Sequence, residues 1–234
     1  MSNNRRPATG SVRAVIFDFD GTLTPLTLDF SLLRARVEQI AREYVDQDII
    51  DRQKDQYILE MIHAIEDEID QSTASFRDRA FRELDRLEIE ACRNKELYPY
   101  ARAVLSYLKE HNIRAGIITR SSATVIRTVF PDLDQYIDAT VTRDDTRYVK
   151  PDPHQLRMAV EALRVEHAAA VIVGDHPTDI AAGKALGAMT AGVLSGRCSR
   201  TDFVDAGADH VFDDIRGVIG LVSSGAVRAG GTQR

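Results

Sequence analysis

The sequence predicts an α/β protein in which a doubly wound, Rossmann-like parallel sheet carries an inserted all-helical cap domain. Two observations support this prediction. Short apolar segments alternate with helical segments from residue 98 onward, and residues 29–96 contain neither glycine nor proline while their apolar residues recur at helical spacing. Alternation of strands and helices produces parallel strands joined by right-handed crossovers. A helical stretch that interrupts this alternation after the first strand is an insertion.

The first predicted strand covers residues 11–19, a run of β-branched and aromatic residues that leads into Gly-Thr and then Pro25. The apolar stretch from Ala14 to Phe17 suits a strand that is covered on both faces, as in a parallel sheet. The glycine and the proline mark the place where the chain leaves the sheet.

The cap is predicted to occupy residues 26–97. Leu33, Val37 and Ile40 recur at spacings of three or four residues and give a charged helix an apolar stripe. Ile50, Tyr57, Met61 and Ile65 repeat the pattern, and Ser72 or Ser75 can cap a third helix. We expect three or four amphipathic helices within the segments 29–45, 48–70 and 76–93.

The core is predicted to comprise residues 11–25 and 98–222, between flexible tails at 1–10 and 223–234 that are small and polar. The strands predicted after the cap are 113–119, 138–142, 168–175, 189–195 and 210–212. The helices predicted between them are 100–112, 121–130, 152–165, 177–187 and 200–207.

Polar residues follow several of the predicted strands. Asp18 and Asp20 close the first strand and Thr119 and Arg120 the second, while Lys150 precedes a helix after the third. Asp175 follows the fourth strand, and Asp179 lies four residues later. In doubly wound sheets the ligand lies beyond the carboxyl ends of the strands, so we expect these residues to meet at one edge.

The chemistry of this set points to phosphoryl transfer. Converging carboxylates repel one another and call for a cation between them, and an all-oxygen donor set without His or Cys favours Mg²⁺. A lysine, a threonine hydroxyl and backbone N–H groups complement a phosphoryl group. Because the sequence contains no Gly-rich phosphate loop, we expect one aspartate to attack phosphorus and its neighbour two residues on to carry the proton.

Four segments, "FDFDGTLT", "IITR", "VKPDP" and "VGDHPTDI", stand in this order between residue 15 and about residue 180. Together they resemble the four motifs of the haloacid dehalogenase-like (HAD) hydrolase superfamily. The nearest resemblance is to its phosphoglycolate-phosphatase-like subfamily, in which a helical cap is inserted between the first and second motifs.

This resemblance implies a role for each matched residue. Asp18 would be the nucleophile and Asp20 the general acid and base. Thr119 and the backbone N–H of Arg120 would hold phosphate oxygens, and Lys150 would neutralise both the nucleophile and the phosphate. The Mg²⁺ ligands would be Asp18, the backbone carbonyl of Asp20, Asp175, and Asp179 either directly or through water.

Other residues near the motifs leave alternatives open. His176 stands where relatives often have Ser or Thr, so it could change the hydrogen bonding around the metal and make activity depend on pH near neutrality. Arg34 and Arg36 could reach an anionic substrate, although charges on an amphipathic helix usually face solvent. We interpret His63 as a surface or packing residue.

We therefore expect a Mg²⁺-dependent phosphomonoester hydrolase that acts on a small phosphorylated metabolite. Three alternatives remain open: a sugar phosphomutase of the same fold, a phosphonatase whose Schiff base would form on Lys54 or Lys95, and a non-enzymatic regulator or scaffold. A haloacid dehalogenase would lack the second aspartate, which is present here as Asp20.

Composition limits the partners. The formal net charge of −6 argues against a nucleic-acid surface. The sequence shows no secretory signal pattern and no apolar run of about 20 residues, so we expect a soluble cytoplasmic protein with no membrane partner. Cys92 and Cys198 are expected to be free thiols. The oligomeric state stays open.

Overall fold

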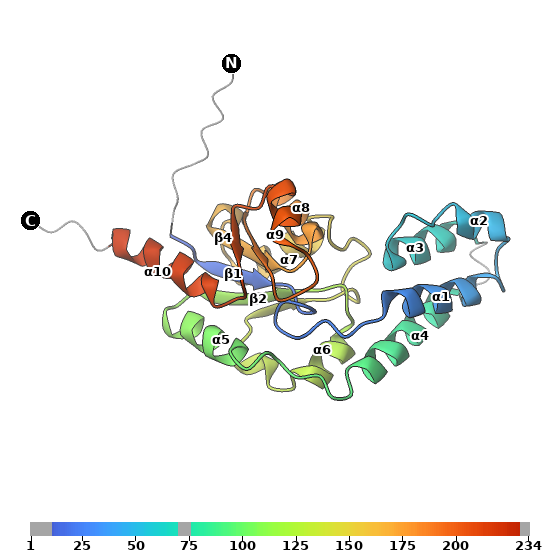
Figure 1. Ribbon diagram of the computed structural model, residues 1–234, viewed down its shortest axis with the longest axis horizontal. Coiled ribbons are helices and arrows are strands. Elements are labelled where there is room, and N and C mark those ends of the chain that lie inside the picture. Colours follow the sequence, from blue (N-terminus) through green and yellow to red (C-terminus); the bar gives the residue numbers. More distant parts are fainter. Residues whose placement is uncertain (1–10, 70–75, 230–234) are drawn as a thin grey trace, which may run out of the picture.

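The computed structural model describes residues 11–69 and 76–229. The expected amino-terminal tail, the last residues of the chain from 230, and the proposed caps Ser72 and Ser75 lie outside these ranges. The chain forms a sheet with helices on both faces, and a group of helices extends to one side of it (Figure 1).

Within the described residues, six parallel strands form one sheet in the order β3-β2-β1-β4-β5-β6. Phe17, the last residue of β1, lies opposite Ile117 on β2 and Val173 on β4, so these three strands end at nearly the same level. The doubly wound fold class is confirmed. The strands are β1 Ala14–Phe17, β2 Arg114–Ile118, β3 Ala139–Val141, β4 Ala170–Gly174, β5 Met189–Val193 and β6 His210–Phe212.

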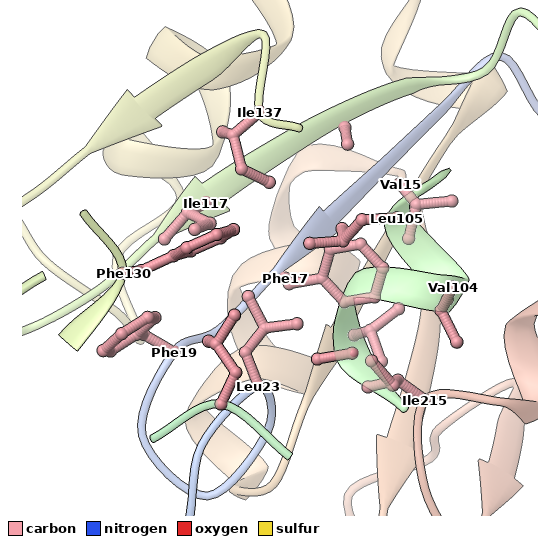
Figure 2. Packing of buried hydrophobic residues seen from close by; sticks show 14 of the residues in the cluster. Val15, Phe17, Phe19, Leu23, Val104, Leu105, Ile117, Phe130, Ile137 and Ile215 are labelled. Atoms are coloured by element: carbon pink, nitrogen blue, oxygen red, sulfur yellow. The ribbon is translucent and has the colours of Figure 1, made fainter. Parts of the chain in front are cut away.

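Helices cover both faces of the sheet because β1 is apolar on both sides. Val15 and Phe17 face a cluster that contains residues of α5, α6 and α10, and Figure 2 shows their side chains near Leu105. Ile16 faces the opposite cluster, to which α7 contributes. The helices are α5 Ala101–Glu110, α6 Ala123–Val129, α7 His154–Leu163, α8 Pro177–Leu186, α9 Arg200–Asp205 and α10 Gly217–Ala229, with short 3₁₀ turns at Leu133–Gln135 and His167–Ala169.

The insertion after β1 is helical, as the sequence predicts, and has a hydrophobic cluster of its own. Leu33 and Val37 of its first helix pack with Ile62 and Phe76. Asp29 caps that first helix because its Oδ1 accepts a hydrogen bond of 3.0 Å from the backbone N–H of Leu32. The boundaries at 26 and 97 stay a prediction. The cap helices are α1 Phe30–Ala41, α2 Gln47–Asp51, α3 Ile58–Glu68 and α4 Phe76–Ala91.

The segment 48–70, predicted as one apolar stripe, is divided into two helices, so the described residues of the cap form four helices, within the three or four expected. The chain turns between α2 and α3, and Tyr57 has an extended backbone conformation at the start of α3. The spacing predicts that Tyr57 lies on the apolar stripe of a helix, but 47% of Tyr57 is exposed and its ring lies under the guanidinium of Arg120. Ile50 is buried in the cap, whereas the turn that follows it has no buried residue, so packing does not hold that turn in a helix.

The prediction of a flexible tail from residue 223 is also wrong for the residues that the structure describes, because α10 continues to Ala229. Val218 and Val222 are buried against the core, and the hydroxyl groups of Tyr107 and Ser223 lie 2.8 Å apart in a hydrogen bond. The small polar residues of this segment predict a tail, but the segment continues a helix that is anchored by the preceding Val218 and Val222. None of the described helices is long and apolar enough to cross a bilayer.

Leu105→Ala should lower the free energy of unfolding by about 2–5 kcal/mol, since Leu105 is fully buried beneath β1 and its truncation leaves a cavity. Val204→Ala is the matched control, because Val204 is 63% exposed on α9 and should change stability by no more than about 0.5 kcal/mol. Urea unfolding measures both. Equal effects of the two substitutions would contradict the packing described here.

Candidate active site

The expected site residues meet at the carboxyl edge of the sheet. Asp18 continues β1, and its backbone N–H donates to the carbonyl of Val173 at 2.8 Å. Thr119 continues β2 and Asp175 continues β4. Phe19 is completely buried in the core cluster, so it anchors the loop between the two aspartates of the first motif. Strand alternation then leaves Asp18 and Asp20 outside that cluster.

Lys150 joins residues from two different strand ends. Its Nζ donates to Oδ1 of Asp18 and to Oδ1 of Asp179, both at 2.6 Å, and only 2% of the residue is exposed. Burial alone would lower the pKa of Lys150, but the carboxylates of Asp179 and Asp18 outweigh that effect and raise it. The lysine is therefore a permanent ammonium ion at the centre of the site.

Asp18, Asp175 and Asp179 form an acidic cluster in which one oxygen from each lies within 4.8 Å of the others. Burial, together with repulsion from Asp179, raises the pKa of Asp18 to about 6 despite its contact with Lys150. Burial, and the nearby charges of Asp18 and Asp179, raise the pKa of Asp175 to about 8. Asp18 and Asp175 therefore lack sufficient compensating positive charge from the protein.

The space around Asp175 depends on two glycines. A Cβ added to Gly21, which has a φ of +86°, would lie 2.3 Å from Oδ2 of Asp175, and one added to Gly196 would lie 1.9 Å from the same oxygen. The carboxylate of Asp175 therefore occupies space that a side chain at position 21 or 196 would fill. Together with the acidic cluster, this all-oxygen donor set fits a hard divalent cation such as Mg²⁺.

Asp179 and His176 form a capping box at the start of α8. The backbone N–H of His176 donates to Oδ2 of Asp179 at 3.1 Å, and Nδ1 of His176 accepts from the backbone N–H of Thr178 at 3.3 Å. Both oxygens of Asp179 therefore already accept hydrogen bonds, one from this backbone and one from Lys150. Burial lowers the pKa of His176, which moves its titration away from neutrality.

Asp20 has two partners that the motifs did not indicate. Ser121 Oγ donates to Oδ2 of Asp20 at 2.7 Å, and Nζ of Lys95 forms an ion pair with Oδ1. The side chain of Lys95 is fully buried. It follows α4, in the segment that returns the chain from the cap to the core. We had considered Lys95 only as a Schiff-base lysine, and Lys54, the other cap lysine, is exposed.

Thr119 is buried, and its Oγ1 accepts a hydrogen bond from the backbone N–H of Ser121 at 3.1 Å. Gln155 donates to the carbonyl of Thr119 at 2.8 Å, which holds the end of β2 against α7. The hydroxyl proton of Thr119 stays free to be donated. Hydrogen bonds to the side chain and to the carbonyl of Thr119 therefore fix the first residue of the loop after β2.

The side chain of Arg120 points to the cap. Its Nη1 and Nη2 donate to the two carboxylate oxygens of Glu60 on α3 at 2.8 and 2.6 Å, and its guanidinium lies 5.0 Å from the ring centre of Tyr57. The backbone N–H of Arg120 is the group expected at the phosphate, and that expectation stays a prediction.

A second arginine of the core also binds the cap. Arg143, which follows β3, donates to Oδ1 of Asp85 and to Oε1 of Glu88 on α4, both at 2.7 Å. Burial raises the pKa of Glu88 to about 7 in spite of this contact. Sequence spacing gave no signal for these pairs, because each joins residues more than 50 positions apart.

A cavity of about 250 Å³ lies between the cap and the sheet edge. Asp18, Asp20 and Asp175 line its floor together with Thr119 and Lys150. The cap side of the wall includes Leu33, Arg34, Tyr57, Leu84 and Glu88.

The arginines at the start of the cap have different positions. Arg34 lines the cavity, whereas Arg36 lies on the outer surface of the cap and pairs with Glu83 at 3.1 Å. His63, which we interpreted as a surface or packing residue, is buried beside Phe81, with 5.8 Å between the ring centres.

A family model for haloacid dehalogenase-like hydrolases matches residues 12–187. The chain belongs to this family of hydrolases. It is 25% identical over 218 residues to the pyrophosphatase PpaX of Oceanobacillus iheyensis, covering 91% of this chain and 97% of that protein. It is 36% identical over 142 residues, 58% of each chain, to a phosphoglycolate phosphatase of Rhodospirillum rubrum.

The fold is shared with solved structures of this family. One is a phosphonoacetaldehyde hydrolase like protein from Oleispira antarctica, which superposes with a TM-score of 0.65 at 19% sequence identity and covers 100% of both chains. At this identity the similarity establishes the fold. The match of the family model confirms, at the level of the family, the resemblance seen in the four sequence motifs.

Without a divalent ion, we expect the melting temperature to fall by roughly 10–20 °C as the pH rises from 5 to 8. Asp18 and Asp175 have folded-state pKa values raised above 3.8, to about 6 and about 8, so their stabilising contribution is complete below pH 3.8 and is lost as the pH passes those values. The magnitude follows from about 1.4 kcal/mol per pKa unit and about 2–4 °C per kcal/mol.

Millimolar Mg²⁺ should abolish most of this fall, and Asp175→Asn, measured in EDTA, should reduce it. Thermal unfolding at several pH values with EDTA or Mg²⁺ measures both effects. A melting temperature that falls equally with and without Mg²⁺ would contradict the assignment of the acidic cluster to a cation.

Proposed function

We propose that the protein is a Mg²⁺-dependent phosphomonoester hydrolase that acts on a small organic phosphate through an aspartyl-phosphate intermediate. The observation that carries this proposal is the position of Asp18. Its carboxylate lies at a strand end on the floor of the cavity and contacts a buried ammonium group. A carboxylate in that place can attack phosphorus while the ammonium offsets the negative charge of both groups.

The neighbouring residues support a division of work. In the first step Asp18 attacks phosphorus, and the bond to the leaving oxygen breaks as Asp20 gives that oxygen a proton. In the second step Asp20 removes a proton from water, which displaces Asp18 from phosphorus and releases phosphate. The hydroxyl of Thr119 and the backbone N–H of Arg120 would bind the phosphate oxygens.

The cation would be held by Asp18, Asp175 and the backbone carbonyl of Asp20. Asp179 would bind it directly or through water, and its two occupied oxygens favour the indirect arrangement. When bound, Mg²⁺ supplies positive charge that neutralises the carboxylates and the phosphate. The acidic cluster supports this assignment.

The names of the relatives, a pyrophosphatase and a phosphoglycolate phosphatase, support cleavage of a bond to phosphorus. The phosphomutase, phosphonatase and scaffold alternatives give different products. Incubation with a hexose 1-phosphate would yield the 6-phosphate from a mutase, free phosphate from a phosphatase and neither from a scaffold. Cys92 and Cys198 are free cysteines, which supports a reducing compartment such as the cytoplasm.

Asp18→Asn should lower the release of phosphate from a phosphomonoester by at least about 10³-fold, because the amide cannot attack phosphorus. The measurement is a steady-state phosphate assay with Mg²⁺, and unfolding of the variant serves as the control for its fold. Wild-type turnover in a folded Asp18→Asn variant would overturn the mechanism.

Lys95→Met should lower kcat on the order of 10-fold or more while KM changes little. Lys95 holds one oxygen of Asp20, and without it the proton carrier is free to turn away from the leaving group. Lys95→Arg, which keeps the charge, should recover part of the activity. If Lys95→Met is folded and turns over as fast as wild type, the positioning role is wrong.

A further inference from the structure

We propose that the natural substrate is a phosphomonoester with an apolar leaving group, and that the enzyme prefers it to pyrophosphate. This inference rests on the proposed function and concerns the cap side of the same cavity. It is carried by two observations: the apolar character of that wall, and the state of the arginines around it.

The wall that faces the leaving group is mainly aliphatic and aromatic. Leu26 and Leu28, in the segment that enters the cap, are half-buried and line the cavity with Leu33 and Leu84. Phe30 also lines it and is 36% exposed. Exposed apolar surface inside a cavity gains free energy when an apolar group covers it.

Two arginines of the core that line the cavity already form ion pairs with carboxylates of the cap. Arg120 is held by both carboxylate oxygens of Glu60, and Arg143 is held by Asp85 and Glu88. Binding an additional anion at either guanidinium would break or share a charge-assisted hydrogen bond within the protein.

Two further arginines border the cavity on this side. Nη1 of Arg34 lies 3.6 Å from Oε1 of Glu38, and Nη2 of Arg34 donates to the backbone carbonyl of Gln56. Arg197 is exposed to solvent at the cavity and stacks on Phe30, with 4.7 Å from its guanidinium carbon to the ring centre. One solvent-screened guanidinium is a weak match for a second phosphate group.

The two classes of substrate therefore meet different surroundings. The leaving group of pyrophosphate is itself a phosphate, which would lose water against leucine side chains and find arginines that already have carboxylate partners. An alkyl or aryl leaving group would lose little in solvation, and each added methylene group that is buried should improve binding about fourfold. The cavity, at about 250 Å³, limits this gain to a small group.

The test is a series of substrates: methyl, propyl, butyl and hexyl phosphate, phenyl phosphate and pyrophosphate, each with Mg²⁺. We expect kcat/KM to rise about two- to fourfold per methylene until the cavity is filled, and to exceed the value for pyrophosphate by at least tenfold. A flat series across the alkyl phosphates would overturn the inference and leave the proposed function intact. Pyrophosphate as the best substrate would overturn the inference and also the assignment to phosphomonoesters, because pyrophosphate is a phosphoanhydride. Failure to hydrolyse any of them would overturn both.

Variants of two neighbouring exposed residues on α1 sharpen the test. Phe30→Ala should lower the ratio of kcat/KM for butyl to methyl phosphate by about threefold or more, because Phe30 lines the cavity. Leu32→Ala is the matched control, since Leu32 is 47% exposed on the same helix and is not part of the lining. The ratio does not depend on the fraction of folded enzyme. Equal ratios in Phe30→Ala and wild type would overturn the role of this wall.

Discussion

The rest of the site depends on the ion pairs that the ammonium group of Lys150 forms with Asp18 and Asp179. A parallel sheet brings the ends of β1 and β4 together, and the carboxylates that follow them would repel one another in a buried place without a cation between them. Lys150 contacts Asp18 and Asp179, so it links the first strand to the start of α8. Lys150 therefore contacts both the proposed nucleophile and the residue whose other oxygen takes part in the capping box of α8.

The cap extends this arrangement across the cavity. Two arginines of the core form ion pairs with carboxylates of the cap: Arg120 with Glu60, and Arg143 with Asp85 and Glu88. Lys95, in the segment that leads from the cap back to the core, forms an ion pair with Asp20. The position of the cap is therefore tied to the loop that is expected to bind phosphate and to the proposed proton carrier. Because these pairs use most of the charges on the inner surface of the cap, the remaining wall is mainly apolar. The specificity that we propose rests on that division.

The sequence was sufficient for the sheet and for the residues at its edge, because strand ends and four ordered motifs are local signals. It did not show that Lys95 and Ser121 hold Asp20, since they lie 75 and 101 positions away from it and meet it only in the folded chain. The break before α3 was missed because Tyr57 fits a helical stripe but packs on Arg120. Helical periodicity cannot distinguish a residue that contacts its own cap from one that contacts the core.

The most direct test of the central claim is to trap the phosphorylated enzyme. With enzyme in excess over a ³²P-labelled alkyl phosphate and Mg²⁺, an acid quench during the turnover should leave label on the protein that hydroxylamine removes. Peptide mapping should place it on Asp18, and Asp18→Asn should show none. Turnover with the label on another residue, or with no label on the protein at any time, would contradict the account.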